Sequence, residues 1–365
     1  MTTSATHRVH NFGAGPAVLP ESVLEEARHD LVALPDVGMS VLEISHRSAV
    51  FDGVLDAAEA DLRQLVGISS EYHVLFLQGG ASQQFAMVPM NLLEPGGVAD
   101  YTLTGTWARK AATEAKKFGH VNVCASTEDE AFTRVPDMNG LQPTPGAAYL
   151  HVTSNNTIVG TQWPLLPSGV EAPLVVDASS DLLSRPVDLS GIGVLYGGAQ
   201  KNLGPAGVTL AVVRKDLAER GADTLPSTLR YAVAAQHGSR YNTPPVFAIY
   251  LSGLVMRWIR EQGGLAVMDT HNRRKAELLY GAIDRTDFYR GTAQLGSRSL
   301  MNVTLRLPTE ELERRFLIEA EEAGMVGLKG HRSVGGLRAS IYNAFPEAGV
   351  TALVQFMAEF ERVNG

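Results

Sequence analysis

Cysteine and long apolar runs are scarce in this chain of 365 residues. Cys124 is the only cysteine, so no disulfide can form within the chain. No apolar run approaches the roughly 20 residues that a helix needs to cross a bilayer, so we expect no membrane-spanning helix. The first residues, MTTSATHRVHNF, lack the charged and then apolar pattern of a secretion signal. We therefore expect a cytoplasmic protein without disulfides.

Basic residues are also fewer than acidic residues. Lys and Arg total 31 against 39 Asp and Glu, which gives a net charge of −8 and a pI of about 5.7. This balance argues against nucleic acid or a membrane surface as a partner. A dinucleotide fingerprint is missing too, because Gly13-Ala14-Gly15-Pro16 has no strand before it and no third glycine. A nucleotide-dependent oxidoreductase is therefore disfavoured, and we assign no metal ligands.

What the chain does have is 45% apolar residues and a regular alternation of helical and strand patterns. Helical spacing of apolar residues is found at positions 19–34, 51–65 and 245–260. Short, continuous apolar runs are typical of strands covered on both faces, and they occur at 73–77, 148–152, 174–176, 193–196 and 208–213. The sequence therefore predicts an α/β fold around a mostly parallel sheet.

A change of pattern follows Gly263-Gly264. Helical spacing at 267–283 and 310–323 then alternates with strand patterns at 301–307 and 337–342. We predict a large domain over residues 16–261. A smaller α+β domain is predicted over residues 262–365, with the N-terminal segment 1–15 attached to it.

A carboxylate and a lysine each follow a predicted strand. Asp177 ends the run Leu174-Val175-Val176, and Lys201 follows the glycine-rich exit Gly197-Gly198-Ala199-Gln200. Ligands gather at the carboxyl ends of parallel strands, so both side chains are expected in one crevice. This pair suits pyridoxal phosphate: the lysine forms a Schiff base, and the carboxylate keeps the pyridine nitrogen protonated. Taken alone, an Asp and a Lys at this separation form a salt bridge or are unrelated surface residues more often than a catalytic pair.

Further candidate cofactor contacts lie at other strand ends. Gly79-Gly80-Ala81-Ser82 follows a strand and opens a helix, whose first amides can bind phosphate. Trp107 follows an extended stretch, where its ring can stack on a pyridine or serve as a core residue. Thr157, with Asn155 and Asn156, follows another strand at the same sheet edge, in what is otherwise a turn.

Six segments occur together in an order that resembles phosphoserine aminotransferases, which are class-V aminotransferases of pyridoxal-phosphate fold type I. They are Ser45-His46-Arg47, Gly79-Gly80-Ala81-Ser82, Asp177, Gly198-Ala199-Gln200-Lys201-Asn202, Asn242-Thr243-Pro244-Pro245 and Lys329-Gly330-His331-Arg332. The likeness extends from Asn11-Phe12 to the final helix. It implies a seven-stranded sheet in the large domain.

The resemblance also assigns roles to residues. Lys201 and Asp177 would be catalytic. The residues implied to hold pyridoxal 5'-phosphate are Ala81, Ser82, Trp107, Thr157, Asp177, Gln200, Lys201, Asn242 and Thr243. Those implied to bind substrate anions are His46, Arg47, His331, Arg332 and Arg338. Asn242 and Thr243 would reach the phosphate of a neighbouring subunit in a homodimer with shared active sites. Some family members carry arginine where this chain has Ser82.

The implied reaction moves an amino group between L-glutamate and 3-phosphohydroxypyruvate, giving O-phospho-L-serine and 2-oxoglutarate in serine biosynthesis. The phosphohydroxythreonine step of vitamin B6 synthesis is a related possibility, because the same residues would bind the phosphate group of that substrate. An alanine–glyoxylate or serine–glyoxylate aminotransferase is an alternative, although it has less use for cations at both substrate ends. A non-catalytic α/β ligand sensor is the alternative from another class, and it would show no visible cofactor absorbance.

Overall fold

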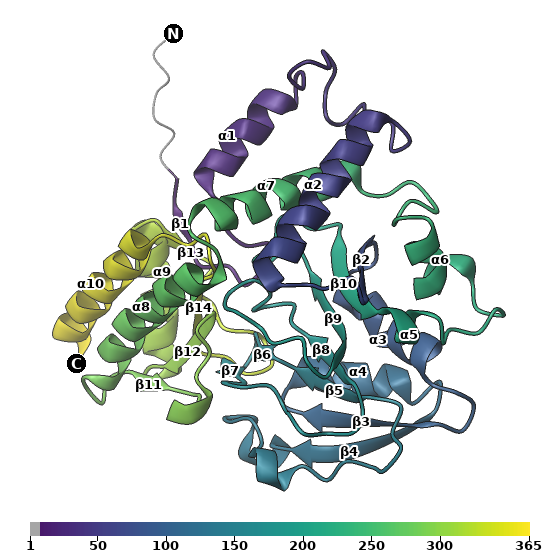
Figure 1. The fold of residues 1–365 in the computed structure, drawn as a ribbon. Coiled ribbons are helices and arrows are strands. Elements are labelled where there is room, and N and C mark those ends of the chain that lie inside the picture. The colour runs from purple at the N-terminus through teal and green to yellow at the C-terminus, as the bar shows by residue number, and fades with distance from the viewer. Residues whose placement is uncertain (1–7) are drawn as a thin grey trace.

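The computed structural model describes residues 8–365, and its centre is a seven-stranded sheet (Figure 1). The strand order is β2-β10-β9-β8-β5-β3-β4. β10 is antiparallel to both of its neighbours, and the remaining pairs are parallel. The strands are β2 (Tyr72–Leu77), β3 (Val98–Leu103), β4 (His120–Ser126), β5 (Leu150–Thr153), β8 (Leu174–Asp177), β9 (Ile192–Gly198) and β10 (Thr209–Arg214). The predicted mostly parallel, seven-stranded sheet is confirmed.

Helices cover both faces of this sheet, which explains its apolar runs. One core contains Leu174 and Val176 of β8 with residues of α1 (Glu21–Asp30), α2 (Ala49–Val66) and α7 (Val246–Glu261). The opposite core contains Val175, because successive strand residues point to opposite faces. The helices on that side are α3 (Gly80–Leu92), α4 (Thr106–Ala115), α5 (Lys215–Ala218) and α6 (Tyr231–Gln236).

A smaller unit is built from the C-terminal part of the chain and lies beside the large sheet in Figure 1. Its three-stranded antiparallel sheet has the order β11-β12-β14. The elements are α8 (Leu265–Asp284), β11 (Arg290–Gly291), β12 (Asn302–Arg306), α9 (Glu310–Glu322), β14 (Leu337–Ser340) and α10 (Glu347–Asn364). β1 (His10–Asn11) pairs in parallel with β13 (Met325–Val326). Phe12 is fully buried in the core of this unit, so β1 and Phe12 of the predicted N-terminal segment pack here, and residues 1–7 fall outside the described part.

The exact boundary between the two units stays a prediction. α7 ends at Glu261 and α8 begins at Leu265, on either side of the predicted position 262. Leu265 and Met268 nevertheless pack into the core that the large sheet forms with α1, α2 and α7. The first turn of α8 therefore contacts both units. Within residues 8–365, no helix combines the length and apolar character that a bilayer crossing requires.

A short hairpin connects the large sheet to the small unit. β6 (Asn155–Asn156) and β7 (Thr161–Gln162) pair in antiparallel fashion just after β5. The Asn155 side-chain amide donates to Asn302 Oδ1 of β12 at 2.8 Å, and the Ser299 hydroxyl donates to Asn155 Oδ1 at 2.6 Å. All three side chains are buried, so these hydrogen bonds hold the carboxyl edge of the large sheet against the small unit.

Candidate active site

Three strand ends bring Lys201, Asp177 and Thr157 to one region. Asp177 is the last residue of β8, Lys201 follows the end of β9, and Thr157 lies in the hairpin after β5. The Lys201 ammonium donates to Thr157 Oγ1 at 2.6 Å. β5, β8 and β9 are neighbours in the sheet, so their carboxyl ends meet at one edge. The structure therefore places these three predicted site residues as the sequence analysis expected.

Burial changes the proton affinity of both charged groups. Burial lowers the pKa of Lys201 to about 8, the Asp177 carboxylate opposes this shift, and the Arg338 guanidinium adds to it. Burial raises the pKa of Asp177, whereas its hydrogen bonds with Ser179 lower it. Asp177 Oδ1 accepts from the Ser179 hydroxyl at 2.6 Å and from the Ser179 amide at 3.0 Å. The site thus contains an amine that is easily deprotonated and a carboxylate whose charge is supported by a neighbouring turn.

The small unit supplies Arg338, which lies on β14. Its Nη1 donates to the Thr157 carbonyl at 3.3 Å, and its Nε is buried without a hydrogen-bond partner. Arg338 is far from Lys201 in sequence, but both contact Thr157. The remaining guanidinium N–H groups are available to an anion, because Arg carries five donors in a planar fork.

His331 and Arg332 lie on the loop between β13 and β14. His331 Nδ1 lies 2.7 Å from the Ser333 hydroxyl and accepts from the Ser333 amide at 3.2 Å. An amide can only donate, so Nδ1 carries no hydrogen and the neutral ring keeps its N–H at Nε2. Burial lowers the pKa of His331, and the cations Arg338, Arg332 and Lys110 lower it further. The lowered pKa favours the neutral ring, whose N–H at Nε2 can donate to an anion.

The glycine turn before α3 lies where the sequence predicts a phosphate cup. Gly79 and Gly80 have φ values of 84° and 67°, which favour glycine, and no side chain caps the helix. The amides of Ala81 and Ser82 lie in the first helical turn, where they have no partner within the helix. Gln200 lies between Gly198 and Lys201, and its carbonyl accepts from the Ala17 amide at 2.8 Å.

Trp107 lies in the first turn of α4, directly after β3. Its Nε1 is buried and has no hydrogen-bond partner. The Lys110 ammonium lies 4.5 Å from the centre of the Trp107 ring. One side of the indole is thus held by a cation, a contact worth about 0.5–1 kcal/mol at an exposed position.

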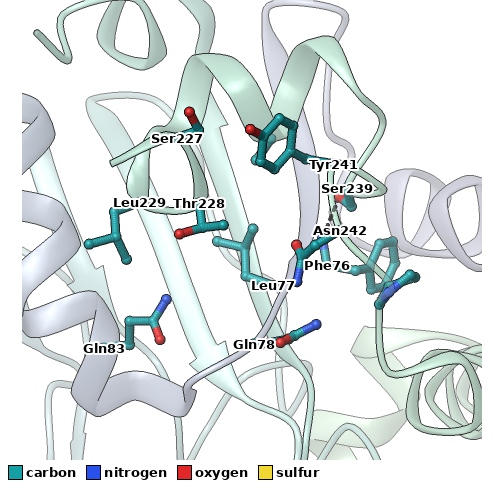
Figure 2. A pocket seen from close by; sticks show the side chains of 12 residues that line it. Phe76, Leu77, Gln78, Gln83, Ser227, Thr228, Leu229, Ser239, Tyr241 and Asn242 are labelled. Atoms are coloured by element: carbon teal, nitrogen blue, oxygen red, sulfur yellow. Dashed lines mark hydrogen bonds between the residues drawn. The ribbon is translucent and has the colours of Figure 1, made fainter. Parts of the chain in front are cut away.

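Four predicted site residues, Asn242, Thr243, His46 and Arg47, lie on segments other than the three strand ends and β14. Asn242 and Thr243 are exposed, and the Gln78 side chain donates to the Thr243 carbonyl at 2.8 Å. Figure 2 shows Asn242 and Gln78 at one pocket with Tyr241 and Ser227. His46 and Arg47 precede α2, and Arg47 is exposed. Among residues 8–365, none of these four side chains hydrogen-bonds with Lys201, Asp177 or Arg338.

Residues 9–353 match the family Aminotransferase class-V. The chain belongs to this family. The phosphoserine aminotransferase of Desulfatibacillum aliphaticivorans is 54% identical over 361 residues, which cover 98% of this chain and 99% of the relative. The structure of phosphoserine aminotransferase from Bacillus circulans subsp. alkalophilus matches with a TM-score of 0.96 and 52% identity, covering 98% of this chain and 99% of that chain. The PLP-bound phosphoserine aminotransferase of Trichomonas vaginalis matches with a TM-score of 0.92 and 37% identity, covering 96% of this chain and 100% of that chain.

This class-V aminotransferase also has site residues that sequence reasoning missed. Ser179 lies two residues after Asp177, and the pattern Asp-x-Ser after a strand is a signal for a turn that hydrogen-bonds the carboxylate. Ser333 has the same spacing from His331. Lys110 is one helical turn after Trp107, a spacing that places both side chains on one face.

Proposed function

We propose that the chain transfers the amino group between L-glutamate and 3-phosphohydroxypyruvate, giving O-phospho-L-serine and 2-oxoglutarate. The observation that carries this proposal is the convergence of Lys201, Thr157 and Arg338, joined by hydrogen bonds of 2.6 and 3.3 Å. The convergence occurs in a chain that is 54% identical to a phosphoserine aminotransferase over nearly its whole length. The pathway served is serine biosynthesis.

The residues present fit pyridoxal 5'-phosphate. The first turn of α3 has no side-chain cap and can receive a phosphate, and the Trp107 Nε1 is buried without a hydrogen-bond partner. Asp177 offers a buried carboxylate for a cationic ring nitrogen, and Lys201 offers an amine with a pKa of about 8. Ala81, Ser82 and Gln200 would hold the phosphate, and Trp107 and Thr157 would contact the ring and its oxygen.

When bound, pyridoxal phosphate supplies an electron-withdrawing ring that accepts the electron pair left at the substrate α-carbon. Lys201 Nζ would take the proton from this carbon and deliver it to the cofactor carbon that receives the amino group, because a pKa of about 8 leaves part of the amine neutral near pH 7. Thr157 orients Nζ through the 2.6 Å hydrogen bond. Asp177 would hold the proton on the ring nitrogen, and the Ser179 hydrogen bonds stabilise the charge of the Asp177 carboxylate.

Substrate anions are bound by groups of the small unit. Arg338 binds the carboxylate through the N–H groups that Thr157 leaves free. Arg332 and the Nε2–H of His331 face the phosphate, and the neighbouring cations strengthen binding of an anion. We assign Arg47 to the substrate carboxylate together with Arg338, and His46 to the substrate phosphate together with His331 and Arg332.

The assembly that we propose is a homodimer in which Asn242 and Thr243 complete the phosphate site of the partner subunit. Asn242 lines the pocket in Figure 2, and it and the neighbouring Thr243 are exposed, which leaves both side chains accessible to a partner subunit. We place the enzyme in the cytoplasm. The buried, unpaired Cys124 is compatible with a reducing compartment.

The experiment that tests this function is initial-rate kinetics with L-glutamate and 3-phosphohydroxypyruvate. Parallel double-reciprocal lines are expected, because the amino group is first left on the enzyme and then transferred. Intersecting lines contradict the mechanism, and equal rates with unphosphorylated serine and glyoxylate indicate the alternative aminotransferase. A parallel assay with the phosphorylated hydroxythreonine substrate decides whether the vitamin B6 step is also served.

The cofactor assignment has its own test. The purified protein should be yellow and lose its colour on borohydride treatment, whereas Lys201→Ala should bind no cofactor covalently. A colourless wild-type protein that takes up no pyridoxal phosphate would support the non-catalytic sensor.

A further inference from the structure

The two ends of the loop that carries His331 and Arg332 are joined by a hydrogen bond between glycines. The Gly330 amide donates to the Gly336 carbonyl at 2.9 Å, and Lys329 forms a bridge with Leu337. A Cβ on Gly330 would lie 2.1 Å from the Gly335 carbonyl oxygen, so no larger residue fits. The loop is therefore a defined turn anchored at both ends to the small sheet.

Arg306, the last residue of β12, packs against this loop. Its Nη1 donates to the Val334 carbonyl at 3.1 Å. A Cβ on Gly336 would meet Arg306 Cδ at 2.6 Å, so the loop backbone lies directly on the arginine side chain. In turn, the amides of Val334 and Gly335 donate to the His331 carbonyl at 3.0 and 2.9 Å. The guanidinium is thus connected to the backbone of His331 through one intervening residue.

Glu313 holds the arginine in this position. Its Oε1 accepts from Arg306 Nε at 2.6 Å and from the Leu307 amide at 3.3 Å. Glu313 is in the first turn of α9 and is only 7% exposed, so its carboxylate is shielded from solvent. A shielded ion pair with good geometry keeps the guanidinium in one orientation, unlike the exposed pairs elsewhere on α9.

We propose that Arg306, oriented by Glu313, is a positioning residue that holds the 330–336 loop in the conformation that binds the substrate phosphate. This inference rests on the proposed function, because it needs His331 and Arg332 to bind that phosphate. A loop held in its binding conformation loses less entropy when the ligand binds. Without the arginine contact, a loop containing Gly330, Gly335 and Gly336 samples many conformations, and His331 and Arg332 face the ligand only part of the time.

The test compares Arg306→Met with Arg315→Met, a matched loss of an arginine that is half exposed on α9 and paired with Glu319. In Arg306→Met, the KM for 3-phosphohydroxypyruvate should rise about tenfold, the equivalent of one hydrogen bond to a charged group. kcat and the visible cofactor absorbance should stay within about twofold, because the cofactor contacts are elsewhere. Arg315→Met should change none of these quantities.

A second measurement does not depend on activity. Hydrogen exchange of the peptide containing residues 331–336, and trypsin cleavage after Arg332, should be faster in Arg306→Met than in Arg315→Met. Glu313→Gln keeps an acceptor oxygen but loses the charge, so it should show a smaller change in both measurements. If Arg306→Met does not fold, Glu313→Gln supplies the same comparison.

Unchanged loop exchange in both variants would overturn the proposal, and so would faster exchange with an unchanged KM. Failure of the proposed function looks different. In that case, wild-type protein shows no transfer to 3-phosphohydroxypyruvate, or Arg332→Met leaves its KM unaltered. A raised KM in Arg332→Met combined with no effect of Arg306→Met rejects the positioning role and leaves the proposed function intact.

Discussion

At the scale of single residues, the Asp177 carboxylate depends on one neighbouring serine. Burial raises the pKa of Asp177, and the Ser179 hydroxyl, at 2.6 Å, is the largest influence that lowers it. A carboxylate must stay ionised to hold a proton on the ring nitrogen. Ser179 therefore maintains the charge on which the proposed chemistry depends.

We expect Ser179→Ala to raise the pKa of Asp177 further, because one hydrogen bond to the charged form is lost. The group ionises above its pKa, so activity should be lost at a higher pH as the solution is acidified. The acid limb of the kcat/KM profile should move to higher pH, and on that limb kcat/KM should fall about tenfold for each unit by which the pKa rises. The measurement is a pH series of initial rates.

Ser190 offers a matched control for that substitution. It makes the same turn with Asp188 on the surface, where its amide and hydroxyl bind the carboxylate at 2.8 and 2.6 Å. Ser190→Ala should leave the pH profile unchanged. Identical profiles for Ser179→Ala and wild type would show that Asp177 needs no such support.

Arg338 presents a second test at this scale. Arg338→Ala should raise the KM for L-glutamate about 10- to 100-fold, since charged hydrogen bonds are worth about 1.5–3 kcal/mol. The cofactor should remain bound, because Lys201 and Asp177 are untouched. Steady-state kinetics and the absorbance spectrum measure both, with the exposed Arg290→Ala as control. An unchanged KM would remove Arg338 from the carboxylate site.

At the scale of elements, a buried lysine connects α8 to the turn after β14. Lys275 is 3% exposed, and its ammonium donates to the carbonyls of Ile341, Tyr342 and Phe345 at 3.0, 2.6 and 3.1 Å. In the same turn, the Asn343 amide donates to Asn202 Oδ1 at 3.0 Å. This turn therefore links the small unit to the residue that follows Lys201.

Lys275→Met should lower the free energy of unfolding by about 3 kcal/mol, because several buried carbonyls lose their donor. Urea unfolding followed by circular dichroism measures this difference. Arg273→Met, on the exposed face of the same helix, should cost less than about 1 kcal/mol. Equal effects of the two substitutions would show that water replaces the ammonium at these carbonyls.

At the scale of the whole molecule, the site is completed by several distant segments and, in our proposal, by a second copy of the chain. Mixing two inactive variants tests this shared site. Lys201→Ala lacks the amine, and Thr243→Glu places a carboxylate where the partner's phosphate would bind. Unfolded and refolded together, equal amounts should recover about a quarter of wild-type activity, because half of the dimers are mixed and each has one intact site.

Thr351→Glu serves as the control for an added surface carboxylate. Thr351 is exposed on α10, on the small unit (Figure 1). This variant should be active by itself. If Lys201→Ala and Thr243→Glu recover no activity when mixed, although each forms dimers, Thr243 does not act across the interface.

Much of the central fold was accessible from sequence, because buried strands leave a clear pattern. β8 and β9 are buried along their whole length and were predicted from continuous apolar runs. β3 and β4 were both missing from the predicted apolar runs: β3, VADYTL, is buried but contains Asp100, and β4, HVNVCAS, is an edge strand with a largely exposed pattern. An edge strand has one neighbour only, so fewer of its residues need to be apolar.

Some residues of the candidate site could also be predicted from local sequence, and others could not. Asp177 and Lys201 follow recognisable strands, so their meeting at one edge followed from the parallel sheet. His331, Arg332 and Arg338 were predicted from the family resemblance alone. No local sequence pattern shows that β14 will lie against the hairpin formed by β6 and β7. Lys110 and Arg306 were not found, since each acts through a contact with a side chain or loop whose position depends on the packing of other elements.

The sequence by itself determined the α/β class and the residues at the strand ends, because apolar periodicity and glycine turns act over a few neighbouring residues. It also determined the composition of the predicted phosphate cup. Only the tertiary structure decided that Thr157 contacts both Lys201 and Arg338, and that Arg306 supports the 330–336 loop. Such contacts join segments more than 20 residues apart and arise when whole faces pack, so local sequence does not specify them.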